Sequence, residues 1–353
     1  IVLSRLKNRN CNVVQKKSGN IKTYFFSANV SWHHELLDDL KELGPTKCFD
    51  YTKHGFKTAE FYRNSNKSNI KRNLMNQLFF EDLKKCNSEN KVDWIFIYAN
   101  GYELSPNILE SIRNELSIPM VLMCLDDKHS WIGKKIGIHR GGQIDIAKFF
   151  DLNWTSSSVA RDWYQAEGGC PILLAPGFNK NKFYPNKSIQ KDIPISFLGA
   201  PYGYRLELID ELRSKGLPVY VYGPGWEQKN NFKLQNLPKN NLEVIHRSQI
   251  NLGCGNIGYS SELFTIKGRD FDIPGSGGMY ITSYAHELAD NFVLNKEIVC
   301  YRSISDLTEL LRYYISNPDK CEEIGNNARI LSIKNHRWIH RFNIILKTLG
   351  IIN

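Results

Sequence analysis

Basic residues and glycines gather near residue 270 of the 353-residue chain, in a pattern that could bind an anion. Lys267 and Arg269 come first, Asp272 follows, and a glycine-rich turn holds Gly277 and Gly278. We expect this stretch to begin a helix and then turn into a buried strand. Glycine-rich helix starts expose backbone amides that suit a phosphate group. A purely structural interpretation stays open, because such a turn can also close a helix tightly against a strand.

A second candidate phosphate contact follows the apolar run at 195–198. Gly199 ends the expected strand and Arg205 begins the expected helix, so backbone amides and a guanidinium group could meet a diphosphate together. A solvated arginine at a helix start is the alternative. The next expected strand ends at Gly223, which could border a pocket for a nucleobase.

Candidate catalytic groups stand after two expected strands in the first half of the chain. His33 and His34 follow the first strand, and Asp126 and Asp127 follow a strongly apolar one. An imidazole or carboxylate in such a place could accept a proton from a hydroxyl group. We expect Asp127 to act, because Asp126 lies nearer the strand and within reach of its backbone amides. A structural role in the loop is the alternative, and we expect the following segment 133–142 to be mobile, as a lid or acceptor-binding loop is.

Short apolar runs alternate with amphipathic stretches along the chain, which predicts an α/β fold built on parallel sheets. In the first series the expected strands are 22–28, 47–51, 93–99, 120–125, 150–154 and 171–175, and the expected helices are 33–43, 69–85, 106–116 and 158–167. In the second series the expected strands are 195–199, 219–223, 242–246, 250–252, 279–282 and 298–301, and the expected helices are 204–215, 268–276 and three that start at 305, 319 and 335.

Composition and charge are those of a soluble globular protein of about two domains. Hydrophobic residues make up 42% and charged residues 23%, which excludes wholesale disorder and a coiled-coil rod. The net charge of +10 favours phosphate-bearing ligands, nucleic acid or an anionic membrane surface, although a dispersed basic surface without a specific partner gives the same total. No apolar run approaches the length of about 20 residues that a bilayer span needs. The eight singly spaced cysteines suit reduced thiols in a cytoplasmic protein.

The stretch around Arg269 resembles a known family. Residues 269–278 read Arg-Asp-Phe-Asp-Ile-Pro-Gly-Ser-Gly-Gly, and Glu287 and the run Glu-Ile-Val-Cys-Tyr at 297–301 follow. Together they resemble the C-terminal domain of the CgeB-like glycosyltransferases, relatives of the group-1 glycosyltransferases with a GT-B fold. The resemblance is strongest over 253–341, and over 1–180 it depends on architecture.

The resemblance implies that the chain has two domains with different binding roles. Residues 1–177 would form an N-terminal, Rossmann-like, acceptor-side domain, and 195–334 a Rossmann-like domain that binds a nucleotide-sugar. Residues 178–194 would form a linker, and 335–353 a last helix for which packing back on the first domain is one open arrangement. The two domains would face each other across a cleft at the carboxyl ends of their strands.

The resemblance also implies roles for acidic residues. Asp272 looks like the second of two acids, the one that contacts the ribose of the nucleotide. Phe264 stands eight residues earlier, where the first acid is expected, and Glu262 lies close by. The Asp-x-Asp pattern at 270–272 resembles a metal motif of another transferase fold, but Arg269 beside it disfavours a divalent cation, and we expect no metal.

The expected activity is sugar transfer from a nucleotide-sugar to an acceptor hydroxyl, with surface-polysaccharide or glycoconjugate synthesis as one setting. The nucleotide-sugar is a donor substrate, and no other cofactor is expected. The acceptor could be a glycan, a lipid-linked molecule or a protein, and nucleic acid is not an expected partner. A cytoplasmic protein with peripheral contact to the inner face of the membrane is one possibility. A sugar-nucleotide epimerase and a non-catalytic two-domain ligand-binding protein are the alternatives.

Overall fold

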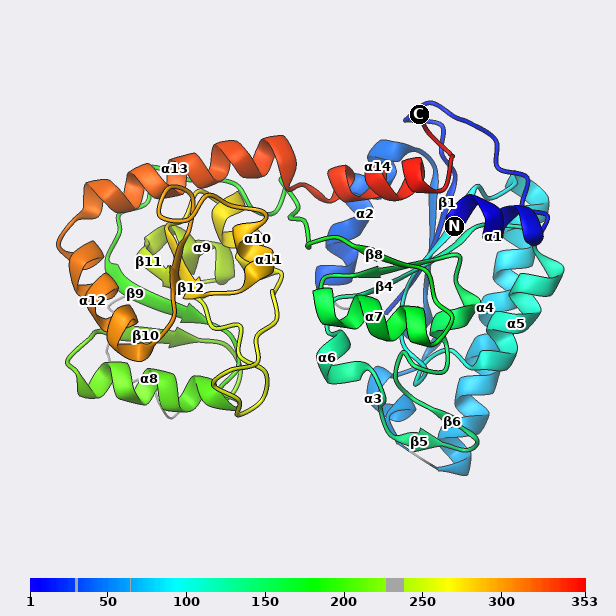
Figure 1. The fold of residues 1–353 in the computed structure, drawn as a ribbon, viewed down its shortest axis with the longest axis horizontal. Coiled ribbons are helices and arrows are strands. Elements are labelled where there is room, and N and C mark those ends of the chain that lie inside the picture. Colours follow the sequence, from blue (N-terminus) through cyan, green and yellow to red (C-terminus); the bar gives the residue numbers. More distant parts are fainter. Residues whose placement is uncertain (29–30, 64, 227–237) are drawn as a thin grey trace. The chain divides into compact units, whose positions relative to one another are not determined.

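The computed structural model describes residues 1–28, 31–63, 65–226 and 238–353, with only the backbone of residues 31 and 32 (Figure 1). The chain divides into two compact units, Ile1–Ala175 with Trp338–Asn353, and Pro176–Arg337. Residues 178–194, which the sequence suggested as a linker, therefore lie within the second unit. Phe178 is buried there, and its backbone amide donates to the carbonyl of His336 at 2.9 Å.

A sheet of six parallel strands forms the centre of the first unit, in the order β2-β1-β3-β4-β7-β8. The strands are β1 (Thr23–Ser27), β2 (Thr46–Asp50), β3 (Trp94–Tyr98), β4 (Met120–Cys124), β7 (Leu152–Thr155) and β8 (Pro171–Leu173). The helices and turns around them are α1 (Val2–Asn8), α2 (Ser31–Leu43), η1 (Tyr51–His54), α3 (Thr58–Phe61), α4 (Asn66–Asn90), α5 (Pro106–Glu115), α6 (Asp127–Ser130), η2 (Ala147–Phe149), α7 (Ser158–Ala166) and α14 (Trp338–Thr348). Each strand of this sheet falls on an expected apolar run.

Apolar side chains cover both faces of this sheet, as parallel sheets require. Successive residues of β1 point to opposite faces, so that Phe25 belongs to one core cluster and Phe26 to the other. Helices α4 and α5 supply the cluster around Phe26. Helices α2 and α14 supply the cluster around Phe25, where the ring of Phe342 lies 5.4 Å from that of Phe96. The last helix of the chain therefore completes the core of the first unit.

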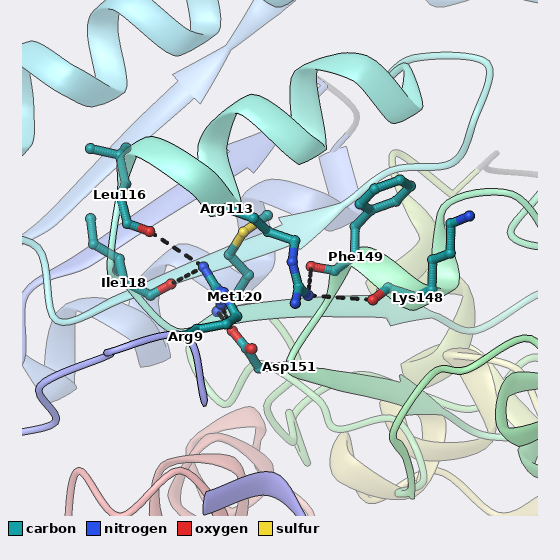
Figure 2. A network of polar contacts seen from close by, with 8 residues as sticks. All are labelled: Arg9, Arg113, Leu116, Ile118, Met120, Lys148, Phe149 and Asp151. Atoms are coloured by element: carbon teal, nitrogen blue, oxygen red, sulfur yellow. Dashed lines mark hydrogen bonds and ion pairs between the residues drawn. The ribbon is translucent and has the colours of Figure 1, made fainter. Parts of the chain in front are cut away.

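Figure 2 shows the polar contacts of Arg9, which directly follows α1, with residues near the amino ends of β4 and β7. Arg9 pairs with the buried carboxylate of Asp151 and also donates to the carbonyls of Leu116 and Ile118. Asp151 accepts a second bond from the backbone amide of Met120 at 2.8 Å. These contacts lie at the edge of the sheet opposite the candidate catalytic residues.

The segment 133–142, expected to be a mobile lid, forms a small hairpin of β5 (Lys135–Ile136) and β6 (His139–Arg140). Backbone bonds attach the hairpin to the loop that follows β3. Gly101 donates to the carbonyl of Gly142 at 3.1 Å, and the amide of Lys134 donates to the hydroxyl of Tyr102 at 2.5 Å. The glycine spacing did not indicate these contacts, because their partners lie more than 30 residues away in the sequence.

The second unit has a sheet of five parallel strands in the order β10-β9-β11-β12-β13. The strands are β9 (Ile193–Leu198), β10 (Val219–Tyr222), β11 (Ser248–Leu252), β12 (Tyr280–Ser283) and β13 (Val299–Tyr301). The helices are α8 (Tyr204–Ser214), α9 (Asn241–Arg247), α10 (Arg269–Gly275), α11 (His286–Ala289), α12 (Ile304–Ile315) and α13 (Pro318–Asn335). None of the helices in the described ranges of either unit is long and apolar enough to cross a membrane.

The expected strand at 242–246 is wrong, because this stretch is helix α9. The side chain of Asn240 accepts a hydrogen bond from the amide of Glu243 at 2.9 Å and so caps the helix. Val244 and Ile245 are buried, which explains why the short apolar run looked like a strand. Short apolar runs do not distinguish buried helices from strands.

Candidate active site

Two arginines from different helices meet at the carboxyl end of β9 in the second unit. Arg269 donates from Nη1 to the carbonyl of Leu198, and Arg205 donates from Nη1 to the carbonyl of Ala200 at 3.2 Å. These carbonyls flank Gly199. A Cβ atom on Gly199 would lie 2.9 Å from Nη1 of Arg269 and 3.3 Å from Nη1 of Arg205. The absence of a side chain at this position leaves room for both guanidinium groups.

The pair concentrates positive charge with little compensation. Among the described residues, neither guanidinium forms an ion pair with a carboxylate. Arg205 is 3% exposed, and its Nε is buried without a hydrogen-bond partner. Burial lowers the pKa of Arg205, and the charge of Arg269 lowers it further. Because a buried charge is costly without a counter-charge, an anion bound here would stabilise both groups.

The loops after three neighbouring strands converge beside these arginines. Gly223, with φ of +135°, follows β10, and a Cβ atom there would lie 2.8 Å from the carbonyl oxygen of Gly199. Gly203, with φ of +59°, packs against Gly258 from the loop after β11, where a Cβ atom would lie 1.9 Å from the carbonyl oxygen. The structure thus brings Gly199, Gly223 and the arginine pair to one place, as the sequence predicted.

The acidic residues near Arg269 have different environments. Asp270 is buried and accepts hydrogen bonds from the hydroxyl of Tyr280 and, at 2.7 Å, from the amide of Lys267. Burial raises the pKa of Asp270, and these bonds oppose that shift. Asp272 is half-buried on α10, and Lys267 is half-buried just before it. Glu262 is exposed on a separate turn.

Gly277 and Gly278 do not join this group. They follow α10 and precede β12, so they lie at the amino edge of the sheet, whereas the arginines lie at its carboxyl edge. Helix α13 packs closely here, since a Cβ atom on Gly325 would lie 2.4 Å from the carbonyl oxygen of Gly277. A Cβ atom on Gly278 would lie 2.9 Å from Ile245. This is the tight packing that the structural interpretation of the motif predicted.

The first unit has a pocket of about 210 Å³ at the carboxyl ends of β1, β3 and β4. Its lining includes His33, Tyr62, Asn100, Glu103 and Asp126. Carboxylate, amide and aromatic groups in one small pocket provide hydrogen bonds and a flat apolar surface. These are the groups that a sugar hydroxyl and its ring can contact.

We expected Asp127 to act and Asp126 to be held by backbone amides, and the exposure of the two aspartates does not fit these roles. Asp126 is exposed, whereas Asp127 is 1% exposed and lies outside the pocket lining. Asp127 accepts hydrogen bonds from the hydroxyls of Thr155 at 2.5 Å and Tyr164 at 2.7 Å. Burial raises the pKa of Asp127 to about 6, although both bonds lower it. Asp127 therefore joins α6 to β7 and α7.

The two candidate histidines, His33 and His34, lie in different surroundings. His33 lines the pocket, its ring lies 4.4 Å from that of Tyr98, and burial lowers its pKa to about 3. An imidazole with so low a pKa is a weak proton acceptor. His34 lies outside the pocket lining, and its Nε2 is 3.3 Å from a carboxylate oxygen of Asp50 at the end of β2.

Glu103 is the pocket residue that the sequence analysis missed. It is 6% exposed, and its two carboxylate oxygens accept hydrogen bonds from the hydroxyl of Tyr51 and the amide of Asn100, each at 2.9 Å. Burial raises the pKa of Glu103 to about 7, against the lowering effects of these bonds and of Arg72. Its position shortly after the apolar strand 93–99 was a usable signal, of the same kind that pointed to Asp126.

Two Rossmann-like units, each on a parallel sheet, define the GT-B class of proteins. Residues 205–347 match the family described as glycosyl transferase-like. The match includes the part of the chain where the sequence resemblance was strongest, 253–341, and it confirms that resemblance at the level of the family. No curated protein sequence matches the chain.

Solved structures with this fold include proteins of differing activity. Sucrose-phosphate synthase from Thermosynechococcus elongatus is 10% identical with a TM-score of 0.64, covering 94% of this chain and 99% of its own. HepE from Anabaena, in complex with UDP and glucose, is 11% identical with a TM-score of 0.60, covering 94% and 100%. A putative UDP-N-acetylglucosamine 2-epimerase from Listeria monocytogenes is 9% identical with a TM-score of 0.51, covering 95% and 98%. At identities of 9–11% the similarity to these structures shows a common fold and not a common activity.

Proposed function

We propose that the protein transfers a sugar from a nucleotide-sugar to an acceptor hydroxyl, without a metal ion. The arginine pair at the end of β9 carries this proposal. A nucleoside diphosphate supplies the negative charge that Arg205 and Arg269 lack among the described residues, and guanidinium groups form strong charge-assisted bonds with phosphate. The HepE structure contains UDP, which is a ligand of this class.

In the proposed reaction the bond between the anomeric carbon and the diphosphate breaks. Negative charge then grows on the diphosphate oxygen that leaves. Arg205 and Arg269 would bind this charge more strongly than that of the intact donor, which lowers the barrier. Gly199 would keep room for both guanidinium groups beside the donor, and Gly223 would border the nucleobase. Asp272 would contact the ribose, and Glu262 is the nearest replacement for the missing first acid.

In this proposal the acceptor molecule binds with its hydroxyl in the pocket of the first unit. A glycan, a lipid-linked molecule or a protein could carry it, and surface-polysaccharide or glycoconjugate synthesis would use such a product. Peripheral contact with the inner face of the membrane fits the net charge of +10. Helix α4 exposes Ile70, Leu74 and Leu78, which lie four residues apart and so share one face of the helix. An apolar helix face of this kind would suit the same peripheral membrane contact.

A sugar-nucleotide epimerase is the second candidate, favoured by the fold shared with the Listeria monocytogenes protein. It would bind the same type of ligand and would need no acceptor. Its product would be an epimeric nucleotide-sugar, whereas a transferase left without an acceptor slowly releases free nucleotide and sugar.

The test is a melting-temperature panel with UDP, GDP, CMP and TDP and the sugar nucleotides of each. A ligand that binds the native state raises its melting temperature. We expect one nucleotide to raise it, and chromatography to show free nucleotide released from its sugar conjugate. No shift with any nucleotide would contradict the proposal, and formation of an epimer would favour the second candidate.

A further inference from the structure

We propose that the pocket of the first unit binds the ammonium group of an amino sugar, through the carboxylates of Glu103 and Asp126 and the side-chain oxygen of Gln143. The pocket lies at the carboxyl ends of β1, β3 and β4, and the residues that line it belong to the first unit. The binding therefore involves this unit alone. That the bound amino sugar is the acceptor rests on the proposed transferase function.

The charge of the pocket lining is opposite to that of the whole protein. The lining includes the carboxyl groups of Glu103 and Asp126 and, among the described residues, no lysine or arginine. Burial lowers the pKa of His33, the histidine of the lining, to about 3, so its ring is neutral near pH 7. In a protein with a net charge of +10, acidic side chains gathered without a cation favour a positively charged ligand.

Arg72 of α4 compensates the charge of Glu103 only in part. It lies outside the pocket lining, and its guanidinium donates to the carbonyls of Tyr102 and Phe61 at 2.5 Å and 2.9 Å. Its charge lowers the pKa of Glu103, but burial has the larger effect and raises that pKa to about 7. A ligand cation in the pocket would supply the stabilisation that the charged form of Glu103 lacks.

The hydrogen bonds of Glu103 fix its carboxylate and leave it able to bind a ligand. The hydroxyl of Tyr51 and the amide of Asn100 donate to different oxygens of the carboxylate, each at 2.9 Å. A carboxylate has about four acceptor positions, so these two bonds leave room for further donors. An ammonium group has three hydrogens to donate and carries the matching charge.

Gln143 is an independent sign that the pocket receives a hydrogen-bond donor. It lines the pocket and is 1% exposed, and its Nε2 donates to the carbonyl of Ala99 at 3.0 Å. Because a carbonyl can only accept, this bond fixes which end of the amide is nitrogen and which is oxygen. The remaining Oε1 is buried and has no hydrogen-bond partner among the described residues. Such an atom costs free energy until a donor reaches it.

Aromatic rings beside these oxygens suit a sugar ring. Tyr62 and Tyr98 line the pocket, and the ring of Tyr62 stacks on that of Tyr102 with centroids 4.3 Å apart. The faces of aromatic rings offer a flat apolar surface and also attract cations. The pocket volume of about 210 Å³ suits one monosaccharide. These features favour an amino sugar over a flexible alkylamine such as a lysine side chain.

The test is a ligand-observed NMR titration of the full chain near neutral pH, without nucleotide. The probes are glucosamine, galactosamine and mannosamine, each compared with its neutral parent sugar and its N-acetyl derivative, and Nα-acetyl-lysine amide. We expect at least one amino sugar to bind at least tenfold more tightly than its two neutral counterparts, which is the scale of one hydrogen bond between charged groups.

Glu103→Gln should reduce this preference to less than threefold, because the amide keeps the size of the side chain and loses the charge. The matched control is Asp82→Asn, which should keep the preference. Asp82 accepts a bond from Tyr24 at 2.7 Å in the same unit and lies outside this pocket. If Glu103→Gln does not fold, Asp126→Asn takes its place, since Asp126 is exposed, and should lower the preference at least threefold.

Equal binding of the amino sugars and their neutral counterparts would overturn the inference, as would tighter binding of the lysine derivative than of any amino sugar. An undiminished preference in the folded variant would also overturn it. Failure of every nucleotide to raise the melting temperature would instead refute the transferase function, and with it the acceptor role. Binding of the amino sugar, measured without nucleotide, would still stand in that case.

Discussion

Arg205 and Arg269 donate to the two carbonyls that flank Gly199, although the two arginines lie more than 60 positions apart in the sequence. Backbone carbonyls at a strand end thus hold both guanidinium groups in place. Preorganised charge of this kind costs little rearrangement when a substrate binds. The relationship explains why the position between the two carbonyls is a glycine.

Removal of one arginine should weaken nucleotide binding. Arg269→Ala should lower the affinity by about 1.5–3 kcal/mol, which is the range for hydrogen bonds to charged groups. Calorimetric titration measures the change. Arg312→Ala, an exposed arginine on α12, is the control and should bind as wild type does. Unchanged affinity in folded Arg269→Ala would remove Arg269 from the site.

A methyl group at Gly199 should displace the arginines. Gly199 has φ of +148°, and its Cβ atom would approach both guanidinium groups. Gly199→Ala should therefore weaken nucleotide binding by at least tenfold. Gly216→Ala is the matched control, since Gly216 has φ of +81° with open space around its Cβ position, so it carries backbone strain alone. Equal nucleotide affinities in the two variants would contradict the prediction.

Asp272→Asn tests the role that the family resemblance implies. The amide keeps the shape and loses the charge, so we expect weaker donor binding with a melting temperature close to that of wild type. Titration with nucleotide and turnover of the donor measure the effect. Survival of both would show that Asp272 is not the ribose contact.

Asp127 should make the free energy of unfolding depend on pH. Its pKa is raised from the usual value of 3.8 to about 6, so the folded protein holds the proton more tightly than the unfolded chain. The stability from the protonated carboxyl is therefore present below pH 4 and is lost as pH rises through about 6. Urea unfolding of Asp127→Asn should show a smaller loss of stability between pH 4 and 7 than wild type. An identical loss in both proteins would contradict the assignment.

The network in Figure 2 predicts that the loss of Asp151 lowers the free energy of unfolding of the protein. Asp151→Ala would leave Arg9 buried without its counter-charge, and breaking a buried pair costs about 3–5 kcal/mol. Denaturant unfolding should show that loss. Lys84→Ala, which breaks the surface pair with Glu81, should cost less than about 1 kcal/mol. Similar costs in the two variants would count against the network.

Much of the fold could be predicted because strands buried on both faces leave continuous apolar runs. Runs such as 93–99 and 120–125 became β3 and β4. The run at 242–246 was wrongly predicted as a strand, because a short buried helix has the same apolar sequence pattern. The capping residue Asn240 is the local signal that distinguishes this helix from a strand.

The site was partly predictable for a similar reason. Arg205 and Gly199 lie at a strand end within a few residues of each other, so local spacing placed them together. Gly277 was misplaced because α10 carries the chain from one edge of the sheet to the other between Arg269 and that turn. Glu103 was missed because its burial depends on Tyr51 and on helices distant in sequence.

The proposed function depends above all on the binding of a nucleoside diphosphate by Arg205 and Arg269. The most direct measurement is calorimetric titration of wild type and of the Arg205→Ala, Arg269→Ala double variant with the selected nucleoside diphosphate and its monophosphate. We expect wild type to prefer the diphosphate by at least tenfold and the folded double variant to lose this preference. Equal binding of the two nucleotides by wild type, or an undiminished preference in the double variant, would contradict it.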